Sequence, residues 1–284
     1  TVTGVQTCAL PICGMLAKDL CTVCERRGWQ VDAYPRSSLD VTDPEAVELT
    51  LSAIKPDVVL HCAAYTAVDR AEEEPEIANQ VNVDGTQNVA IASTGVGARM
   101  VYVSTDFVFD GAKGTPYLPE DPTNPLSVYG ASKRAGELVT LEHARNSLVV
   151  RTGWLFGSGG RNFVSTVLRL AAEGGELRVV DDQFGGPTWA ADLAETVAGL
   201  MELGVTGVFH AANSGVASWH DLASEALRLK GYTAPSRVST TDWGAVAARP
   251  AFSALDIAGT EMCLGRDLPH WKGALAGFLK EARV

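Results

Sequence analysis

Positive charge is scarce in this chain of 284 residues, where 23 lysines and arginines stand against 34 aspartates and glutamates, a formal net charge of −11. A surface of this sign repels a nucleic-acid backbone and an anionic membrane, so we expect neither as a partner. The sequence also lacks an apolar run near the roughly 18 residues of a membrane span, and it lacks a secretory signal. We therefore expect a cytoplasmic protein that binds a small molecule.

Cysteines are few and scattered, with six in the whole chain. A disulfide framework needs more of them at closer spacing, so we expect free thiols. Cys21 and Cys24 form a C-x-x-C within an expected helix, but no second pair and no histidine cluster accompany them. The sequence therefore predicts neither a redox centre nor a metal site here.

A glycine-rich turn is also missing from the start. Residues 1–13 read TVTGVQTCALPIC, with neither a clean strand nor the turn that should follow it. Residues 14–20 resemble the second half of a G-x-x-G-x-x-G/A loop entering its helix, which places Pro11 where the first glycine belongs. Proline cannot take the positive φ of glycine and has no N–H. We expect residues 1–13 to be foreign and similar to translated sequencing-adapter read-through, with a divergent first strand as the alternative.

Alternation of elements is the main feature that is present. Helix-like stretches separate most of five short β-branched runs, at residues 58–64, 100–104, 148–152, 177–180 and 208–211. This pattern predicts an α/β fold with a Rossmann-like, doubly wound parallel sheet. Proline after a capping residue predicts helix starts at Pro44 and Pro75, the second helix running to Val89.

The last 70 or so residues lose this alternation and contain short segments such as 218–230 and 270–282. We expect an NAD(P)-binding domain in residues 1–152, with a return segment at about 183–213. Residues 153–284 would form mainly a smaller C-terminal substrate-binding lobe. Ligands of open α/β sheets bind at the carboxyl ends of the strands, so this lobe would close over a substrate.

The strongest chemical signal is Tyr129-Gly130-Ala131-Ser132-Lys133, a Y-x-x-x-K at the start of a helical run. The i, i+4 spacing puts the phenol and the ammonium on one helix face. A neighbouring cation favours the ionised phenol and lowers its pKa toward the working range, so Tyr129 can give a proton to a substrate carbonyl oxygen. The alternative is a half-buried tyrosine beside a surface lysine.

A second signal lies about 25 residues upstream, where an apolar strand ends in Ser104 and Thr105. A hydroxyl at the carboxyl end of a strand supplies a donor for the same carbonyl oxygen. Together the two segments match the catalytic triad of short-chain dehydrogenases. The sequence thus predicts Thr105, Tyr129 and Lys133 as the catalytic positions.

Small residues follow the strand at 57–61 and would let a dinucleotide approach the backbone. His61 at its end is either functional or simply packed, and Asn82 resembles a position that braces the neighbouring strand. Arg36, in the segment that would reach the adenosine, could accept a 2′-phosphate. The choice between NADPH and NADH stays open. The positions expected for the cofactor are Gly14, Met15, Leu16, Arg36, Asp40, Val41, Cys62, Ala63, Ala64, Tyr65, Ser104, Tyr129 and Lys133.

Five blocks resemble the dTDP-4-dehydrorhamnose reductases of the extended short-chain dehydrogenase/reductase superfamily. They are AYTAVD at 64–69, STDFVF at 104–109, RTGWLFG at 151–157, DDQFGGPT at 181–188 and RP at 249–250. The resemblance implies hydride transfer from NADPH or NADH to the C4 ketone of dTDP-4-dehydro-L-rhamnose, giving dTDP-L-rhamnose for cell-surface polysaccharide. It implies that Tyr129 protonates the alkoxide, Lys133 holds the nicotinamide ribose and Thr105 steadies the carbonyl oxygen.

The same resemblance implies which residues meet the sugar. They are Thr66, Val68, Asp106, Trp154 and Gln183. Trp154 would present its face to the deoxysugar ring, unless it is a core aromatic. Some family members form a homodimer with Mg²⁺ at the contact; Asp19 and Glu195 fall in the right neighbourhoods, but the acidic ligands are not clearly matched and we assign no metal.

Two other functions fit the pattern less well. A reductase or epimerase for another nucleotide sugar would share the fold and the triad. A non-catalytic protein like the regulatory subunit of methionine adenosyltransferase would bind a dinucleotide without needing the placed acid Tyr129.

Overall fold

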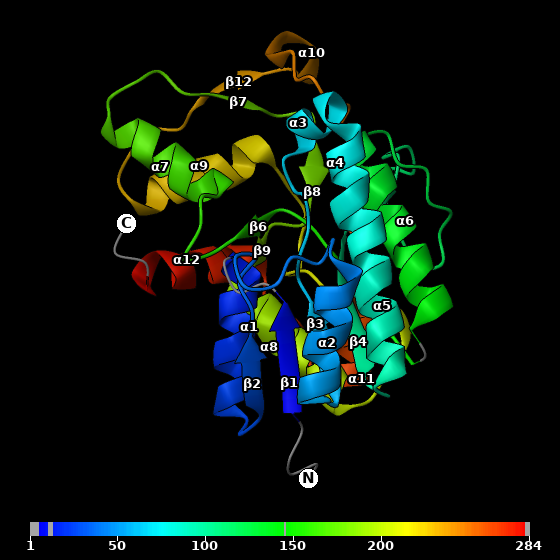
Figure 1. Ribbon diagram of the computed structural model, residues 1–284. Helices are drawn as coiled ribbons and strands as arrows, with labels where there is room; N and C mark the ends of the chain where they lie inside the picture. The colour runs from blue at the N-terminus through cyan, green and yellow to red at the C-terminus, as the bar shows by residue number, and fades with distance from the viewer. Residues whose placement is uncertain (1–5, 11–13, 145, 282–284) are drawn as a thin grey trace.

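The computed structural model describes residues 6–10, 14–144 and 146–281. Its centre is a six-stranded parallel sheet in the order β10-β5-β4-β3-β1-β2. Figure 1 shows the lobe of the later helices beyond the end toward which β1 runs. The strands are β1 (Gln6–Leu10), β2 (Gln30–Ala33), β3 (Val58–His61), β4 (Arg99–Thr105), β5 (Leu148–Thr152) and β10 (Gly207–His210).

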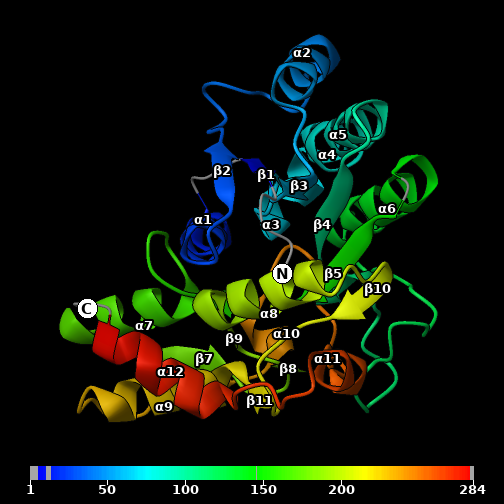
Figure 2. The same ribbon diagram turned by 90° about the horizontal axis from the view of Figure 1, so that it is seen from below.

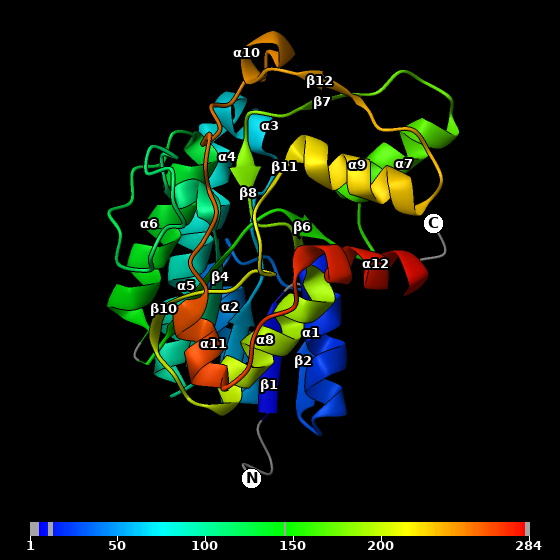
Figure 3. The same cartoon turned by 180° about the vertical axis from the view of Figure 1, so that it is seen from behind.

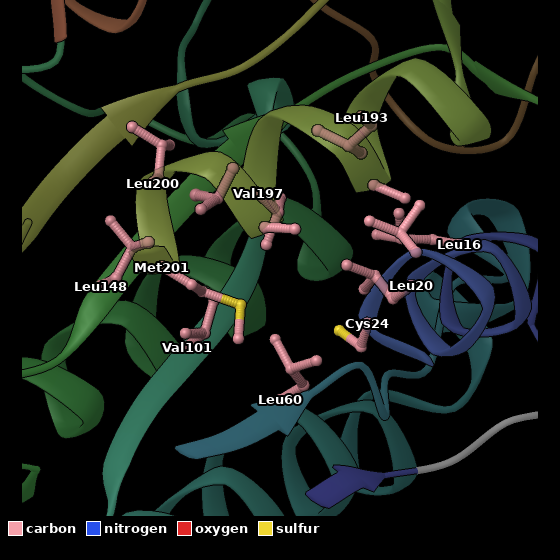
Figure 4. Packing of buried hydrophobic residues seen from close by; sticks show 14 of the residues in the cluster. Leu16, Leu20, Cys24, Leu60, Val101, Leu148, Leu193, Val197, Leu200 and Met201 are labelled. Atoms are coloured by element: carbon pink, nitrogen blue, oxygen red, sulfur yellow. The ribbon is translucent and has the colours of Figure 1, made fainter. Parts of the chain in front are cut away.

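Helices cover both faces of this sheet (Figure 2). On one face lie α1 (Met15–Arg26) and α8 (Ala190–Glu202), and on the other lie α2 (Pro44–Ile54), α5 (Gly85–Gly95) and α6 (Val128–His143). Figure 4 shows Leu20 of α1 and Val197 of α8 meeting Leu60 and Val101 of the sheet. Full burial of one leucine or valine side chain stabilises the folded state by about 1.5–3 kcal/mol. This apolar layer therefore holds α1 against the sheet.

The predicted α/β fold with a parallel sheet is confirmed. Four of the five β-branched runs join the sheet, but residues 177–180 do not. They form β7 (Arg178–Val180), which pairs with β12 (Ser236–Val238) in the lobe. A short apolar run predicts a strand at these residues. The strand with which it pairs is determined by tertiary packing.

Both predicted helix starts are confirmed. Asp43 accepts a hydrogen bond from the Ala46 amide at 3.1 Å and caps α2, and Pro44 occupies the first turn. The helix that begins with α4 (Pro75–Asn79) passes through a π-helix (Gln80–Asp84) into α5, so it ends at Gly95 rather than Val89. A π-helical turn inside a helix often marks a functional site.

Residues 1–13 show no clean strand in the sequence, yet the structure places β1 among them. Its backbone pairs with both β2 and β3, in a register that aligns Cys8 with Asp32 and Val59. Hydrogen bonds to two flanking strands can hold a segment whose side-chain pattern is weak, since strand propensity depends on context. The foreign origin of residues 1–13 stays a prediction, and the turn at Pro11 lies outside the described residues.

The lobe has its own apolar core, in which Phe156, Leu275 and Phe278 are buried between α7, α9 and α12 (Figure 3). The boundary at residue 152 stays a prediction. Within the described residues no helix is long and apolar enough to cross a membrane. The remaining elements are α3 (Val68–Glu73), α7 (Phe163–Ala172), α9 (Trp219–Leu229), α10 (Thr240–Trp243), α11 (Ala258–Leu264), α12 (Trp271–Glu281), β6 (Leu155–Phe156), β8 (Phe184–Gly185), β9 (Thr188–Trp189), β11 (Ala217–Ser218) and a 3₁₀ turn (Asp106–Val108).

Candidate active site

The order of the strands places a ligand site at the carboxyl ends of β1 and β3, because β2 and β3 lie on opposite sides of β1. Gly14 is the N-cap of α1, and a Cβ added there would meet nothing within 4 Å. The open N-terminus of this 12-residue helix suits a phosphate group. Leu16 is buried in the core, so only its backbone is free for the predicted cofactor contact.

A small pocket of about 80 Å³ lies between the segment after β2 and the segment after β3. It brings together five predicted cofactor residues, and Leu39 and Val81 complete its wall. The Arg36 Nε lies 3.6 Å from Asp40 Oδ2 at the rim. The predicted residues are Arg36, Asp40, Val41, Ala63 and Ala64. That these residues contact the cofactor stays a prediction.

Asn82 of the π-helix fixes the segment that follows β3. Its Oδ1 accepts a hydrogen bond from the Tyr65 amide at 2.8 Å, and its Nδ2 donates to the Tyr65 carbonyl at 3.1 Å. The same Nδ2 lies 2.9 Å from the Ser132 hydroxyl of α6. The interpretation of Asn82 as a structural brace is confirmed.

His61 is fully buried, with its Nε2 3.1 Å from the Thr86 hydroxyl. That hydroxyl donates to the Asn82 carbonyl, so the His61 Nε2 is the donor to it. Burial lowers the pKa of His61 to about 3, with the Lys133 charge acting in the same direction. Of the two alternatives for His61, the packed neutral histidine is confirmed.

Tyr129 and Thr105 lie together at the carboxyl end of β4. Ser127 caps α6, so Tyr129 falls in the first helical turn, where Phe107 packs edge-on against its ring with centroids 5.8 Å apart. Burial raises the pKa of Tyr129 to about 12, although a hydrogen bond with Thr105 acts the other way. That this pair acts on one carbonyl oxygen stays a prediction.

Lys133 departs from the prediction. Its Nζ donates to the Val103 carbonyl at 2.7 Å and lies 4.0 Å from the centre of the Tyr102 ring. The ammonium is thus directed at β4, and the pKa of Tyr129 is raised by burial instead of being lowered as expected. Burial also lowers the pKa of Lys133 itself, to about 7, while the Glu137 charge raises it.

Ser104 points away from the predicted cofactor side. Alternation along β4 turns its side chain toward α6, where its hydroxyl donates to Glu137 at 2.6 Å. Thr105 points the opposite way. The Ser104 hydroxyl is thus engaged by Glu137, and its place in the cofactor site stays a prediction.

Asp106 follows Thr105 and is buried. It accepts hydrogen bonds from the hydroxyls of Thr105 and of Ser253, which belongs to the lobe. Burial raises its pKa to about 6 against these two bonds. Asp106 thus joins the sheet edge to the lobe beside Tyr129.

The predicted sugar residues divide between accessible and buried positions. Thr66 is exposed and Val68 half-buried at the start of α3. Trp154 is 9% exposed and stacks on Trp219. Gln183 lies in a pocket of about 250 Å³ in the lobe, which is lined by Phe163, Arg178, Val179, Val180, Gln183, Trp219, Trp243 and Arg249. Arg249 reaches from this pocket to Asp69.

Asp19 and Glu195 are the acidic residues considered as metal ligands. Glu195 forms ion pairs with Arg26 and Arg27. Burial raises the pKa of Asp19 to about 6. Among the described residues, no three His, Cys, Asp or Glu side chains are grouped to hold a metal ion.

Sequence reasoning missed Trp219, Ser253 and Glu137. Each reaches the site through contacts that no local motif records, although Glu137 lies one helical turn after Lys133. Arg249 was noted only as part of a resembling block and given no role.

Comparison with known proteins agrees with this geometry. The family model described as "RmlD substrate binding domain" matches residues 12–284. A dTDP-4-dehydrorhamnose reductase of Streptomyces griseus is 44% identical over 92% of this chain and 89% of its own length. A probable dTDP-4,6-dihydroxy-2-methyloxan-3-one 4-ketoreductase of Streptomyces antibioticus is 40% identical over 92% and 90%.

Among solved structures, a dTDP-4-dehydrorhamnose reductase of Bacillus anthracis in complex with NADP is 35% identical, with a TM-score of 0.95 over 99% of this chain and 100% of that one. The fold agrees with these matches. The chain therefore belongs to the RmlD family and is an NAD(P)-dependent reductase of the dTDP-sugar class.

Proposed function

We propose that the chain reduces the C4 ketone of dTDP-4-dehydro-L-rhamnose to dTDP-L-rhamnose, for cell-surface polysaccharide synthesis. The observation that carries this proposal is the pairing of Tyr129 with Thr105 at the sheet edge, beside the buried Asp106. A full-length relative that is 44% identical and bears this enzyme's name supports the substrate.

The reduced nicotinamide supplies the hydride when it is bound. Tyr129 gives its proton to the alkoxide that forms at C4, and its pKa of about 12 keeps it protonated until then. Thr105 donates a hydrogen bond to the same oxygen. Lys133 holds the nicotinamide ribose. Thr66, Val68, Asp106, Trp154 and Gln183 bind the sugar, and the pocket beside Gln183 takes the adjoining part of the substrate.

A second candidate is reduction of another dTDP-linked ketosugar. The 40% identical ketoreductase relative favours it, because the same tyrosine and threonine serve either ketone. A substrate panel separates the two candidates by the sugar that gives the highest kcat/KM.

The test is oxidation of NADPH and NADH with dTDP-4-dehydro-L-rhamnose, with the product identified. Tyr129→Phe should lower kcat by about 10²–10⁴-fold, since it removes the general acid. Tyr232→Phe, on the exposed outer part of the lobe, is the matched control and should retain activity. Bound NADPH without turnover of any ketosugar would move the assignment to a non-catalytic dinucleotide-binding protein.

A further inference from the structure

The walls of the 250 Å³ pocket in the lobe combine aromatic rings with positive charge. Phe163, Trp219 and Trp243 supply the rings, and Arg178 and Arg249 supply guanidinium groups. None of the described residues that line the pocket is acidic, although the whole chain has a net charge of −11. Because sites for a drug-sized ligand have volumes of roughly 300–1,000 Å³, this pocket suits one end of a larger molecule. Its walls fit an aromatic group that is joined to an anion.

The two indoles of the pocket differ in exposure. Trp219 is half-buried and stacks on Trp154, and the Phe163 ring packs against it with ring centroids 4.6 Å apart. Trp243 is 56% exposed. Trp219 therefore belongs to the inner wall, whereas the ring of Trp243 is accessible to a ligand.

Asp182 and Gln183 attach the helix that carries Trp243. This helix, α10, begins at Thr240, whose amide donates to the two Asp182 carboxylate oxygens at 3.0 and 2.9 Å. The Thr240 hydroxyl donates to the same carboxylate at 2.5 Å and accepts from Gln183 Nε2 at 2.9 Å. The Gln183 Oε1 accepts from Trp219 Nε1. Gln183 thus links α10, which lies beside β7 and β12 at one end of the lobe (Figure 3), to the inner wall.

Arg249 connects this pocket with the sheet edge. Its Nη1 and Nη2 donate to Asp69 at 3.0 and 2.8 Å. Asp69 belongs to α3, which begins at Val68, two residues after Thr66. Both Thr66 and Val68 are predicted to meet the sugar. Arg249 therefore lies between the lobe pocket and the predicted position of the sugar.

The chemistry of the substrate decides which end of it enters the lobe. In the proposed reaction the C4 ketone meets Tyr129 and Thr105 at the sheet edge. C1 lies across the pyranose ring from C4, and the nucleoside diphosphate is attached at C1. The end that points away from the ketone is thus a planar base joined to two phosphates. Bases stack on aromatic side chains, and a guanidinium binds phosphate oxygens through two parallel hydrogen bonds.

We propose that the lobe pocket binds the nucleoside diphosphate end of the substrate: the base stacks on Trp243, and the diphosphate lies between Arg178 and Arg249. This inference rests on the proposed function, because the ketone at Tyr129 is what directs the nucleotide into the lobe. It assigns Trp243 and Arg178, which no motif of the sequence indicates, to substrate binding.

The experiment measures the dissociation constants of dTDP and dTMP for the whole chain by calorimetry, without any sugar and without turnover. Trp243→Leu should raise both constants by about 10-fold, the scale of one lost base–aromatic stack. Trp243→Phe keeps a ring and should restore most of the affinity. Binding of dTDP should also quench the tryptophan emission of the parent, and Trp243→Leu should lose most of this quenching.

The charge of the pocket is tested separately. Arg178→Met should raise the dissociation constant of dTDP by about 5-fold and that of dTMP by less, because dTMP has one phosphate fewer. Arg237→Met is the matched control, since Arg237 lies on the neighbouring strand β12 and pairs with Asp181 at 3.1 Å but does not line the pocket. It should change both constants by less than about 2-fold. Trp243 and Arg178 are both exposed, so their variants should fold.

The outcomes separate this proposal from the proposed function. A parent that does not bind dTDP, or dissociation constants unchanged in Trp243→Leu and Arg178→Met, would overturn the nucleotide site. Equal effects of Arg178→Met and Arg237→Met would overturn the part of Arg178. Weaker dTDP binding in both pocket variants, with no reduction of dTDP-4-dehydro-L-rhamnose by the parent, would support the nucleotide site and count against the proposed substrate.

Discussion

The indole of Trp154 lies parallel to that of Trp219, with ring centroids 3.6 Å apart and the planes inclined by 2°. Trp154 has a φ of +51°, in the left-handed region that a bulky residue rarely adopts. A Cβ on Gly185 would come 2.4 Å from the Trp154 indole, so glycine is required there. The Trp219 Nε1 donates to Gln183 at 3.2 Å. Trp219, which was not predicted, therefore contacts both Trp154 and Gln183, which were predicted to bind the sugar.

Trp219→Ala should reduce the free energy of unfolding by about 2–3 kcal/mol, because it removes a half-buried aromatic and its stack. It should also raise KM for the sugar substrate more than KM for NADPH, since Trp219 lines the lobe pocket. Urea unfolding and steady-state kinetics measure both. Trp243→Ala is the control: Trp243 lines the same pocket but is 56% exposed, so its stability cost should stay within about 0.5 kcal/mol. An equal loss in the free energy of unfolding for the two variants would contradict this explanation.

Arg249 and Asp69 join the lobe to α3 across 180 residues of sequence. Two bonds, Nη1 to Oδ1 at 3.0 Å and Nη2 to Oδ2 at 2.8 Å, form a two-pronged pair that lowers the pKa of Asp69. Arg249→Lys keeps the charge but loses this geometry, so KM for the sugar should rise by about 3- to 10-fold. Asp69→Asn should raise it similarly.

A double-mutant cycle on this pair should give a coupling energy of about 0.5–1 kcal/mol in stability, modest because both side chains are partly exposed. Strict additivity of the two substitutions would mean that the pair does not hold the lobe to α3.

Much of the fold could be predicted from patterns within single segments of the sequence. Residues 148–152 form β5 with the predicted bounds, since a β-branched run between turns is a signal complete within its own sequence. The prediction that Tyr129 and Lys133 share one helix face likewise depends on a single segment. By contrast, Ser253 meets Asp106 across 147 residues, and the partner of Glu137 on β5 is 14 residues away. Such contacts are created by packing, and no single segment encodes them.

The electrostatic properties of the site were harder to predict from the sequence than the fold. The sequence places a cation near Tyr129, but it does not show that burial raises the pKa of that phenol or that the Lys133 ammonium is directed at the Val103 carbonyl. In the same way, nothing in Gln6–Leu10 reveals that two flanking strands will hold it.

Acid should destabilise the protein through His61. Its pKa of about 3 in the fold lies below the ordinary histidine value of 6.5, so the unfolded chain binds the proton first and stability falls as the pH drops below 6.5. His61→Gln should flatten this loss by about 2 kcal/mol between pH 7 and 5. Asp106, whose pKa is raised to about 6, acts in the opposite direction below that pH, so the variant is compared with the parent at each pH. Parallel stability curves would show that His61 is not the titrating group.

Cofactor preference should depend on Arg36. Its side chain is 74% exposed at the rim of the 80 Å³ pocket, where its Nε lies 3.6 Å from Asp40 Oδ2. A 2′-phosphate there would meet the guanidinium, whereas the free hydroxyl of NADH gains little from it. Arg36→Ala should raise KM for NADPH by about 10-fold and change KM for NADH by less than about 2-fold. Lys55→Ala, on the surface at the end of α2, controls for loss of charge alone. A matched rise for both cofactors would mean that Arg36 supports the pocket wall and does not read the phosphate.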